Sequence, residues 1–283
     1  MPHMRVLTTL GTLAAGLLLV SSCAPADESA APPAQPSDCS KDALRTLQAG
    51  TLTFGTDQPA YAPWFVDNDP ANGKGFESAV AYAVANELGY AKDDVAWVRV
   101  PFNSAIAPGP KTFDANLSEF SITDERKQAV DFSSPYFDVT QAVITTKGSP
   151  AAGVASVDAL RSFKLGAQVG TTSYTAAAAI DPEVAVFNSN EDAKAALANR
   201  QIDALVLDLP TAFAVQGDLP DGVIVGQLPP SGGATEQFGI VLDKGSPLTA
   251  CVSQAVDRLG DNGDLFRLQK EWLSKPGQAP LLS

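Results

Sequence analysis

Two charged residues, Asp208 and Arg126, stand at positions from which they could bind a small charged molecule. Asp208 directly follows the apolar run Ala204-Leu205-Val206-Leu207, which places it at the carboxyl end of an expected strand, where the sites of α/β proteins collect. Arg126 lies in the charged run 123–127, and a guanidinium can hold a carboxylate through two parallel hydrogen bonds. An acid that only caps a strand end and a surface charge at the start of a helix would have the same sequence context. These two residues alone therefore leave open whether they bind a ligand or have a structural role.

The composition excludes several other kinds of chemistry. The one histidine in 283 residues, His3, is lost if the N-terminus is a cleaved signal, and histidine triads and HExxH zinc sites are then excluded. Three cysteines are too few and too scattered for a zinc knuckle or an iron–sulfur cluster. The net charge of −13 argues against nucleic acid as a partner, and the sequence has no GxxxxGK[ST] loop for ATP. We therefore expect no metal and no cofactor.

The first 22 residues are predicted to be a lipoprotein signal peptide. Arg5 supplies a positive start, and the apolar run 6–20 is shorter than the roughly 20 residues that a membrane span needs. The segment Val20-Ser21-Ser22-Cys23 resembles a bacterial lipobox, in which the cysteine thiol receives the lipid. We expect an exported protein that lipidated Cys23 anchors to the outer face of the cytoplasmic membrane. An ordinary signal peptide with an incidental cysteine is the alternative.

Residues 23–39 are expected to form a tether, because the stretch 24–37 contains four prolines and little that could pack. With Cys23 lipidated, Cys39 and Cys251 are an even pair in an oxidising compartment. We predict that these two cysteines form a disulfide between the start of the folded part and a C-terminal helix. Two buried thiols are the alternative.

From Cys39 onward, strand-like and helix-like segments alternate. Apolar runs of strand length occur at 52–55, 95–100, 142–146, 165–169, 204–207 and 238–242. Helical patterns occur at 78–88, where Gly89 is the expected end, and at 190–199, 248–259 and 264–273. This alternation predicts an α/β protein with a mostly parallel sheet.

Several short motifs along the chain appear in an order and at intervals known from one family. They are LTFGTD (52–57) with YAPW (61–64), GFE (75–77) with ELG (87–89), SITDER (121–126), VDFSSPY (130–136), GTT (170–172) with Asp203-Ala204 and Asp208, and FGI (238–240) with KGS (244–246). Together they resemble the bacterial extracellular solute-binding proteins of family 3, the polar amino-acid-binding subunits of ABC importers. The resemblance covers about residues 44–273.

The resemblance implies a two-lobed, periplasmic-binding-protein-like (type II) clamshell with two hinge strands. Lobe 1 would comprise residues 40–140 plus 236–276, lobe 2 residues 141–235, and the C-terminal tail residues 277–283. The implied function is that of a substrate-binding protein, not an enzyme, that closes on an amino acid and delivers it to an ABC permease. We expect a monomer. An exported enzyme similar to cyclohexadienyl dehydratase, with Glu119 or Glu77 as general acid, is the alternative.

The resemblance also implies which residues contact the ligand. Arg126 would clamp the ligand carboxylate, with Ser121 as a second donor, and Asp208 would accept the α-ammonium group. The lobe-2 loop that completes the carboxylate site would comprise Gly170, Thr171 and Thr172, with the N-terminus of a following helix facing the anion.

The pocket for the ligand side chain would combine aromatic and acidic groups. Tyr61 and Phe102 match aromatic positions that sandwich the ligand, with Trp64 nearby. Asp57 and Glu77 match positions that face its distal end. Together with Glu119, these acids favour a basic or polar amino acid as the ligand.

Two features depart from the family pattern. Glu119 stands where members usually have a small residue, so it points away, is offset by Arg126, or contacts a cation of the ligand. Pro108 and Pro110 interrupt a segment that is usually helical, which predicts a shortened helix and a loop near the mouth of the cleft.

Overall fold

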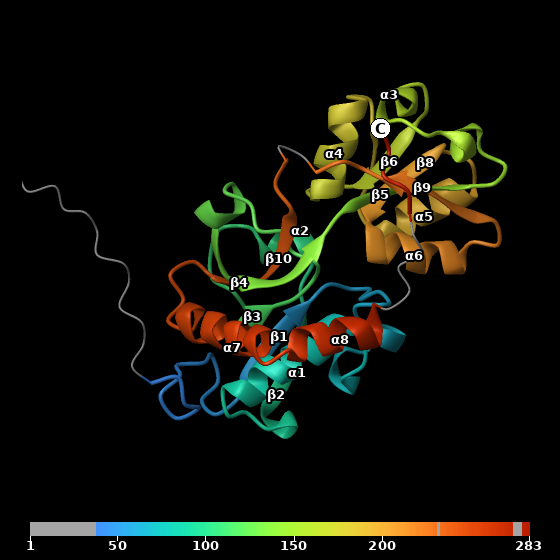
Figure 1. Ribbon diagram of the computed structural model, residues 1–283. Helices are drawn as coiled ribbons and strands as arrows, with labels where there is room; N and C mark the ends of the chain where they lie inside the picture. The colour runs from blue at the N-terminus through green and yellow to red at the C-terminus, as the bar shows by residue number, and fades with distance from the viewer. Residues whose placement is uncertain (1–37, 231–232, 274–278) are drawn as a thin grey trace, which may run out of the picture. The chain divides into compact units, whose positions relative to one another are not determined.

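The computed structural model describes residues 38–230, 233–273 and 279–283 (Figure 1). The predicted signal peptide, the lipidation site Cys23 and nearly all of the predicted tether therefore lie outside the described residues. Among the residues that are described, no helix is long and apolar enough to cross a membrane. The described chain forms two five-stranded sheets, each with its own helices.

The first sheet has the strand order β2-β1-β3-β10-β4. Its strands are β1 (Leu52–Thr56), β2 (Val95–Arg99), β3 (Ala115–Asn116), β4 (Val130–Val139) and β10 (Glu236–Asp243). β1 runs parallel to β2 and β3, whereas β10 is antiparallel to β3 and β4. All five residues of β1 are buried, as is usual for a strand that helices cover on both faces.

The helices that accompany this sheet are α1 (Phe76–Glu87), α2 (Phe102–Ala105), α7 (Thr249–Asp261) and α8 (Asp264–Trp272), with 3₁₀ turns at Val66–Asn68, Pro70–Asn72, Lys92–Asp94 and Arg126–Gln128. The alanine-rich α1 buries Val80, Ala81 and Val84 in the core, and it ends just before Gly89, whose φ of +84° favours glycine. The predicted shortened helix is α2, which spans four residues and is followed by the loop that contains Pro108 and Pro110.

The second sheet has the order β7-β6-β8-β5-β9. Its strands are β5 (Gln141–Thr146), β6 (Leu165–Gln168), β7 (Ala185–Phe187), β8 (Ala204–Asp208) and β9 (Gly222–Gln227). Its helices are the 3₁₀ turn Pro150–Gly153, α3 (Val157–Leu160), α4 (Thr172–Ile180), α5 (Asn190–Ala198) and α6 (Leu209–Asp218). Hydroxyl groups of Ser156, Thr171 and Ser189 accept hydrogen bonds from backbone N–H groups at the starts of α3, α4 and α5.

Both sheets are mixed, which corrects the prediction of a mostly parallel sheet. In the second sheet β6 is parallel to β7 and β8, but β5 is antiparallel to β8 and β9. The chain passes from β4 to β5 through Thr140 and crosses back between β9 and β10 (Figure 1). Every antiparallel pair includes β5 or β10, the two strands that follow these crossings. This is because the chain leaves the first sheet and comes back to it in the opposite direction.

The C-terminal residues 279–283, which were expected to be part of a tail, pack against the second sheet. The N–H group of Gln227 donates to the carbonyl of Pro280 (2.7 Å), and the N–H group of Leu282 donates to the carbonyl of Gln227 (2.9 Å). Leu282 is buried in the core of this sheet. The close approach depends on Gly226, because a Cβ atom there would lie 2.7 Å from the Pro280 carbonyl oxygen.

The structure contains the predicted disulfide between Cys39 and Cys251. Cys251 is buried in α7, and Cys39 packs against the same core from the N-terminal end of the described chain. The bond therefore fastens the beginning of the folded part to one of its last helices.

We expect this disulfide to contribute about 2–5 kcal/mol to the free energy of unfolding, because a link between distant residues restricts the unfolded chain. Urea titrations with and without a reductant measure this contribution. The double variant Cys39→Ser/Cys251→Ser is the control, and its unfolding midpoint should not respond to the reductant. A wild-type midpoint that is equally insensitive would contradict the expectation.

Candidate ligand-binding site

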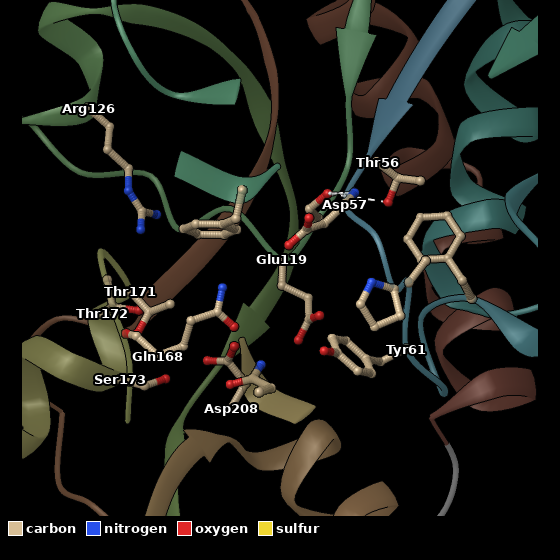
Figure 2. Close-up of a pocket in the computed structure, with 16 residues that line it drawn as sticks. Thr56, Asp57, Tyr61, Glu119, Arg126, Gln168, Thr171, Thr172, Ser173 and Asp208 are labelled. Atoms are coloured by element: carbon tan, nitrogen blue, oxygen red, sulfur yellow. Dashed lines mark hydrogen bonds between the residues drawn. The ribbon is translucent and has the colours of Figure 1, made fainter. Parts of the chain in front are cut away.

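A pocket lies where the loops of the two sheets meet (Figure 2). The predicted site residues that line it are Asp57, Tyr61, Phe102, Glu119 and Arg126 from lobe 1 and Thr171, Thr172 and Asp208 from lobe 2. The other lining residues are Thr56, Pro59, Ala60, Phe65, Ser118, Gln168, Ser173 and Asn190. Figure 2 shows Arg126 with Thr171 and Thr172 toward one end, Asp57 and Tyr61 toward the other, and Asp208 and Glu119 between them.

The guanidinium of Arg126 joins backbone groups of both lobes. It donates to the carbonyl of Ser121 (2.7 Å) and to the carbonyl of Gly170 (3.0 Å), and the side chain lies over the ring of Phe102, with 5.4 Å between the guanidinium carbon and the ring centroid. Phe102 in turn stacks on Phe120. Burial lowers the pKa of Arg126, and the nearby acids partly oppose this change. The guanidinium is therefore held in a fixed orientation with one edge toward the pocket.

The loop that carries Gly170 turns sharply into α4. Gly170 has a φ of +75°, and a Cβ atom there would overlap the side-chain oxygen of Asn103, so both conformation and space require glycine. The Thr171 hydroxyl accepts from the N–H group of Tyr174 (3.0 Å) and donates to the carbonyl of Gln168 (2.8 Å). The first N–H groups of α4 have no acceptors within the helix, so this end can support an anion that Arg126 holds.

Asp208 is the last residue of β8 and lies directly before α6. Its carboxylate accepts a hydrogen bond from Nε2 of Gln141 (2.7 Å). Burial raises the pKa of Asp208 well above its ordinary value, and the negative charge of Glu236 raises it further, while Gln141 and Arg126 oppose the shift. A cationic group of a ligand would relieve this unfavourable environment.

Glu119 also faces the pocket, and its backbone is in an unusual conformation. Its φ is +58°, and its N–H group donates to the carboxylate of Glu77 (2.7 Å). Its own carboxylate accepts from the hydroxyl of Thr211 in lobe 2 (2.7 Å). Burial raises the pKa of Glu119 well above its ordinary value, and the negative charge of Asp208 adds to the effect.

Two residues that were expected at the pocket lie in the core behind it. Glu77 is fully buried in α1, where it accepts hydrogen bonds from Glu119 and from the hydroxyl of Tyr136, and burial raises its pKa to about 7. Trp64 is also fully buried, and its indole N–H donates to the hydroxyl of Thr211 (2.8 Å). Both residues therefore support Glu119. Glu77 binds the backbone N–H group of Glu119, and Trp64 binds Thr211, which in turn binds the Glu119 carboxylate.

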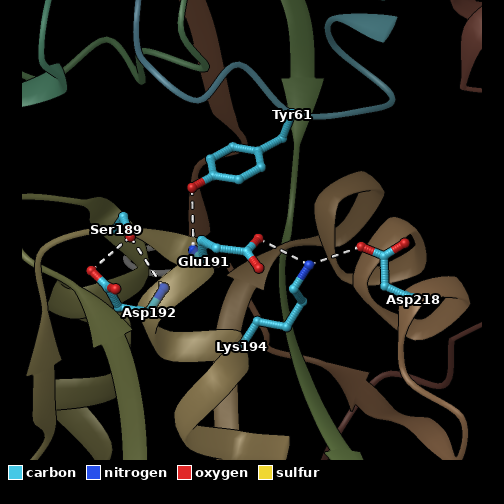
Figure 3. A network of polar contacts seen from close by, with 6 residues as sticks. All are labelled: Tyr61, Ser189, Glu191, Asp192, Lys194 and Asp218. Carbon is cyan, nitrogen blue, oxygen red and sulfur yellow. Dashed lines mark hydrogen bonds and ion pairs between the residues drawn. The ribbon is translucent and has the colours of Figure 1, made fainter. Parts of the chain in front are cut away.

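At the other end of the pocket, Tyr61 reaches across to lobe 2 (Figure 3). Its hydroxyl accepts from the N–H group of Glu191 in the first turn of α5 (3.2 Å). Lys194 forms ion pairs with the carboxylates of Glu191 (2.9 Å) and Asp218 (3.0 Å), which joins α5 to α6. Nearby, burial raises the pKa of Asp57, which directly follows β1.

Sequence reasoning did not identify Gln141 and Glu236, which connect several site residues. They are the first residues of β5 and β10, so each directly follows a crossing between the sheets. The Glu236 carboxylate accepts from the hydroxyl groups of Ser121 (2.5 Å) and Thr172 (2.5 Å). The only available signal was a polar residue one or two positions before an expected apolar strand at each expected lobe boundary.

The arrangement is suited to binding a small zwitterion that carries an additional positive charge. One end offers a guanidinium and a helix N-terminus to an anion, and the remainder offers the carboxylates of Asp208, Glu119 and Asp57 together with aromatic rings. Groups from two α/β lobes converge on one pocket, which is typical of the class of two-lobed solute-binding proteins.

The chain belongs to the bacterial extracellular solute-binding proteins, family 3. The model of this family matches residues 52–275. The L-arginine-binding protein of Pseudomonas aeruginosa is 31% identical over 240 residues, which cover 78% of this chain and 90% of that protein. The predicted family is therefore confirmed.

Solved structures of similar proteins have the same two-domain fold. The arginine-, lysine-, histidine-binding protein ArtJ of Geobacillus stearothermophilus matches with a TM-score of 0.67 and 27% identity, over 81% of this chain and 97% of that one. The ancestral amino acid-binding protein AncCDT-1, described as a precursor of cyclohexadienyl dehydratase, matches with a TM-score of 0.65 and 30% identity, over 79% of this chain and 95% of that one. The predicted two-lobed fold is confirmed.

Glu77 is expected to make the empty protein less stable as the pH rises. Because its folded-state pKa of about 7 exceeds the ordinary 4.5, the folded protein binds more protons than the unfolded chain between these values, and the free energy of unfolding falls across this range as the pH increases. Glu77→Gln retains an oxygen that accepts from Glu119 and Tyr136 but does not ionise. The variant should therefore show a flatter profile and a higher melting temperature above pH 7.

Thermal unfolding at a series of pH values measures this effect. The matched control is Glu271→Gln, which makes the same chemical change at an exposed position and should leave the profile as it is in the wild type. Some dependence on pH should persist in Glu77→Gln, because the pKa values of Asp208 and Glu119 are raised as well. Identical profiles for wild type and Glu77→Gln would show that Glu77 is not the source.

Proposed function

We infer that this chain is the extracytoplasmic substrate-binding protein of an ABC transporter, which captures an amino acid between its lobes and delivers it to a membrane permease. The observation that carries this inference is that Arg126 of lobe 1 and Asp208 of lobe 2 face one pocket. A zwitterionic amino acid needs an anion-binding and a cation-binding group at close range, and closure of the lobes supplies both. The names of the relatives, which include arginine-binding proteins, support the same function.

We further propose a basic amino acid as the ligand. Beyond Asp208, the pocket contains the carboxylates of Glu119 and Asp57 and the ring of Tyr61, which together suit a guanidinium or ammonium group at the distal end. Glu119 is directed by its neighbours: the indole N–H of Trp64 donates to Thr211, so the single hydroxyl proton of Thr211 goes to Glu119. The carboxylate is thereby held as an acceptor.

The route to the membrane belongs to the same proposal. Cleavage before Cys23 and lipidation of that cysteine would anchor the protein to the outer face of the cytoplasmic membrane, and residues 23–39 would tether it there. The same proposal takes the protein to be a monomer. A lipoprotein with a Cys39–Cys251 disulfide is consistent with an oxidising compartment.

An enzyme similar to cyclohexadienyl dehydratase is the second candidate. It would need a general acid in the pocket, and the raised pKa of Glu119 meets that requirement. Prephenate, however, has no ammonium group for Asp208, and the similar ancestral protein is itself described as amino acid-binding. Amino-acid capture therefore accounts for more of the site.

A thermal-shift screen of the protein from Asp38 onward, which keeps both disulfide cysteines, tests the proposal. The ligands are the twenty amino acids, ornithine, cystine, polyamines and prephenate. A ligand at a hundred times its dissociation constant should add about 2.7 kcal/mol and raise the melting temperature by a few degrees. Shifts with arginine, lysine, histidine or ornithine would support the basic ligand. Consumption of prephenate, with no shift from any amino acid, would support the enzyme instead.

Arg126→Ala should weaken binding of the amino acid found in the screen by about 2–4 kcal/mol, because it leaves the buried ligand carboxylate without its partner. Isothermal titration calorimetry measures the change. Lys127→Ala removes the neighbouring cation, which is exposed, and should leave affinity unchanged. A loss of less than tenfold in Arg126→Ala would rule out the clamp.

Glu119→Gln should reduce the affinity for arginine about tenfold more than the affinity for citrulline, the neutral analogue of arginine. Glutamine can still accept the hydrogen bond from Thr211, so the change removes only the charge. Thr211→Val should act in the same direction but less strongly, because it releases the carboxylate without neutralising it. Titration of both ligands against each variant measures the ratio, and equal losses for arginine and citrulline would exclude contact with the distal cation.

A further inference from the structure

The carboxylate of Glu236, at the start of β10, is a point of convergence for side chains from both lobes. Its Oε1 accepts from the hydroxyl groups of Ser121 in lobe 1 (2.5 Å) and Thr172 at the start of α4 (2.5 Å). Its Oε2 accepts from Nε2 of Gln141 on β5 (2.9 Å). These bonds are separate from the backbone pairing with β4 that places β10 in its sheet.

These contacts determine where the hydroxyl protons lie. A carboxylate only accepts hydrogen bonds, and each hydroxyl group has one proton. Thr172 lines the pocket, and Ser121 is buried next to it. If both hydroxyl groups donate to Glu236, their oxygens can only accept any further hydrogen bond. Their oxygens are 3.1 Å apart, so they form a pair of adjacent acceptors. This differs from the expectation that Ser121 is a second donor to the ligand carboxylate.

Gln141 extends the same arrangement to Asp208. Its Nε2 donates to Glu236 (2.9 Å) and to Asp208 (2.7 Å), and its Oε1 accepts from the hydroxyl of Ser173 (2.7 Å). The amide is therefore oriented from both ends, with its NH₂ group between the two carboxylates. Asp208 is thus held at a fixed position relative to the hydroxyl groups of Ser121 and Thr172.

We propose that Glu236, together with Gln141, is a positioning residue for the ligand's α-ammonium group. By taking the protons of Ser121 and Thr172 and fixing Gln141, it directs three acceptors toward the ammonium: two hydroxyl oxygens and the Asp208 carboxylate. The ligand carboxylate is left to Arg126 and to backbone N–H groups. Because Ser121 and Thr172 belong to different lobes and Glu236 stands at a crossing between them, this acceptor set is assembled only when the lobes come together. The proposal rests on the proposed function, since it concerns the same ligand.

The first test compares L-arginine with 5-guanidinopentanoate, which lacks only the α-ammonium group. In Glu236→Gln, an NH₂ group replaces one acceptor oxygen. That group either faces the hydroxyls of Ser121 and Thr172, which can then no longer donate to it, or faces Nε2 of Gln141 and breaks the hydrogen bond that orients the amide toward Asp208. The preference for arginine over the des-amino analogue should fall about tenfold. Glu236→Asp, which keeps the carboxylate, should recover part of the preference, and Gln237→Ala on the same strand should leave it unchanged. Equal losses for both ligands would indicate a merely structural role and overturn the proposal.

The second test needs no ligand. In the empty protein, Ser121→Ala should lower the melting temperature clearly in the wild-type background but hardly at all in Glu236→Ala, because the hydrogen bond is already absent there. Additive shifts would overturn the proposal. If the cycle is non-additive but the wild type binds no L-arginine, the basic ligand of the proposed function is wrong, whereas the hydroxyl orientation set by Glu236 stands.

Discussion

The structure depends on the need to keep several carboxylates and one guanidinium partly out of water in a single pocket. Taking charges out of water is unfavourable unless hydrogen bonds or opposite charges compensate. Arg126 is compensated by backbone carbonyls from both lobes, and Asp208 by Gln141. The acids nevertheless outnumber the cation, and burial and mutual repulsion raise the pKa values of Asp208 and Glu119. A positively charged group of a ligand would offset this excess of negative charge.

The two crossings between the lobes contribute chemistry as well as connection. Gln141 and Glu236 each begin a strand directly after a crossing, and their side chains are hydrogen-bonded to one another. Residues that move least when two lobes rotate about a hinge are well placed to define the position of groups that arrive from either side. The C-terminal residues 279–283 add to the second sheet from outside, next to Gln227 of β9, so the end of the chain also belongs to lobe 2.

Much of the fold followed from local patterns. The helix expected at 78–88 is α1, which spans Phe76–Glu87, and the helix expected at 264–273 is α8, which spans Asp264–Trp272. These helices could be predicted because periodic apolar residues and a terminal glycine act over short distances. The direction of the strands was not predictable in this way. Whether β5 runs parallel or antiparallel to β8 depends on how the chain crosses between the sheets, and apolar runs carry no record of that path.

The sequence by itself determined the class of protein, its two-lobed fold and the candidate carboxylate and ammonium partners Arg126 and Asp208, since ordered motifs and residue chemistry are local properties. Only the tertiary structure decided which acids face the pocket. Glu77 and Glu119 are similar in chemistry, yet Glu77 is buried behind the site and supports the left-handed backbone of Glu119, which faces the ligand space. Glu236 became visible for the same reason: its hydrogen-bond partners are 64 to 115 residues away in sequence, and only folding brings them within reach of its carboxylate.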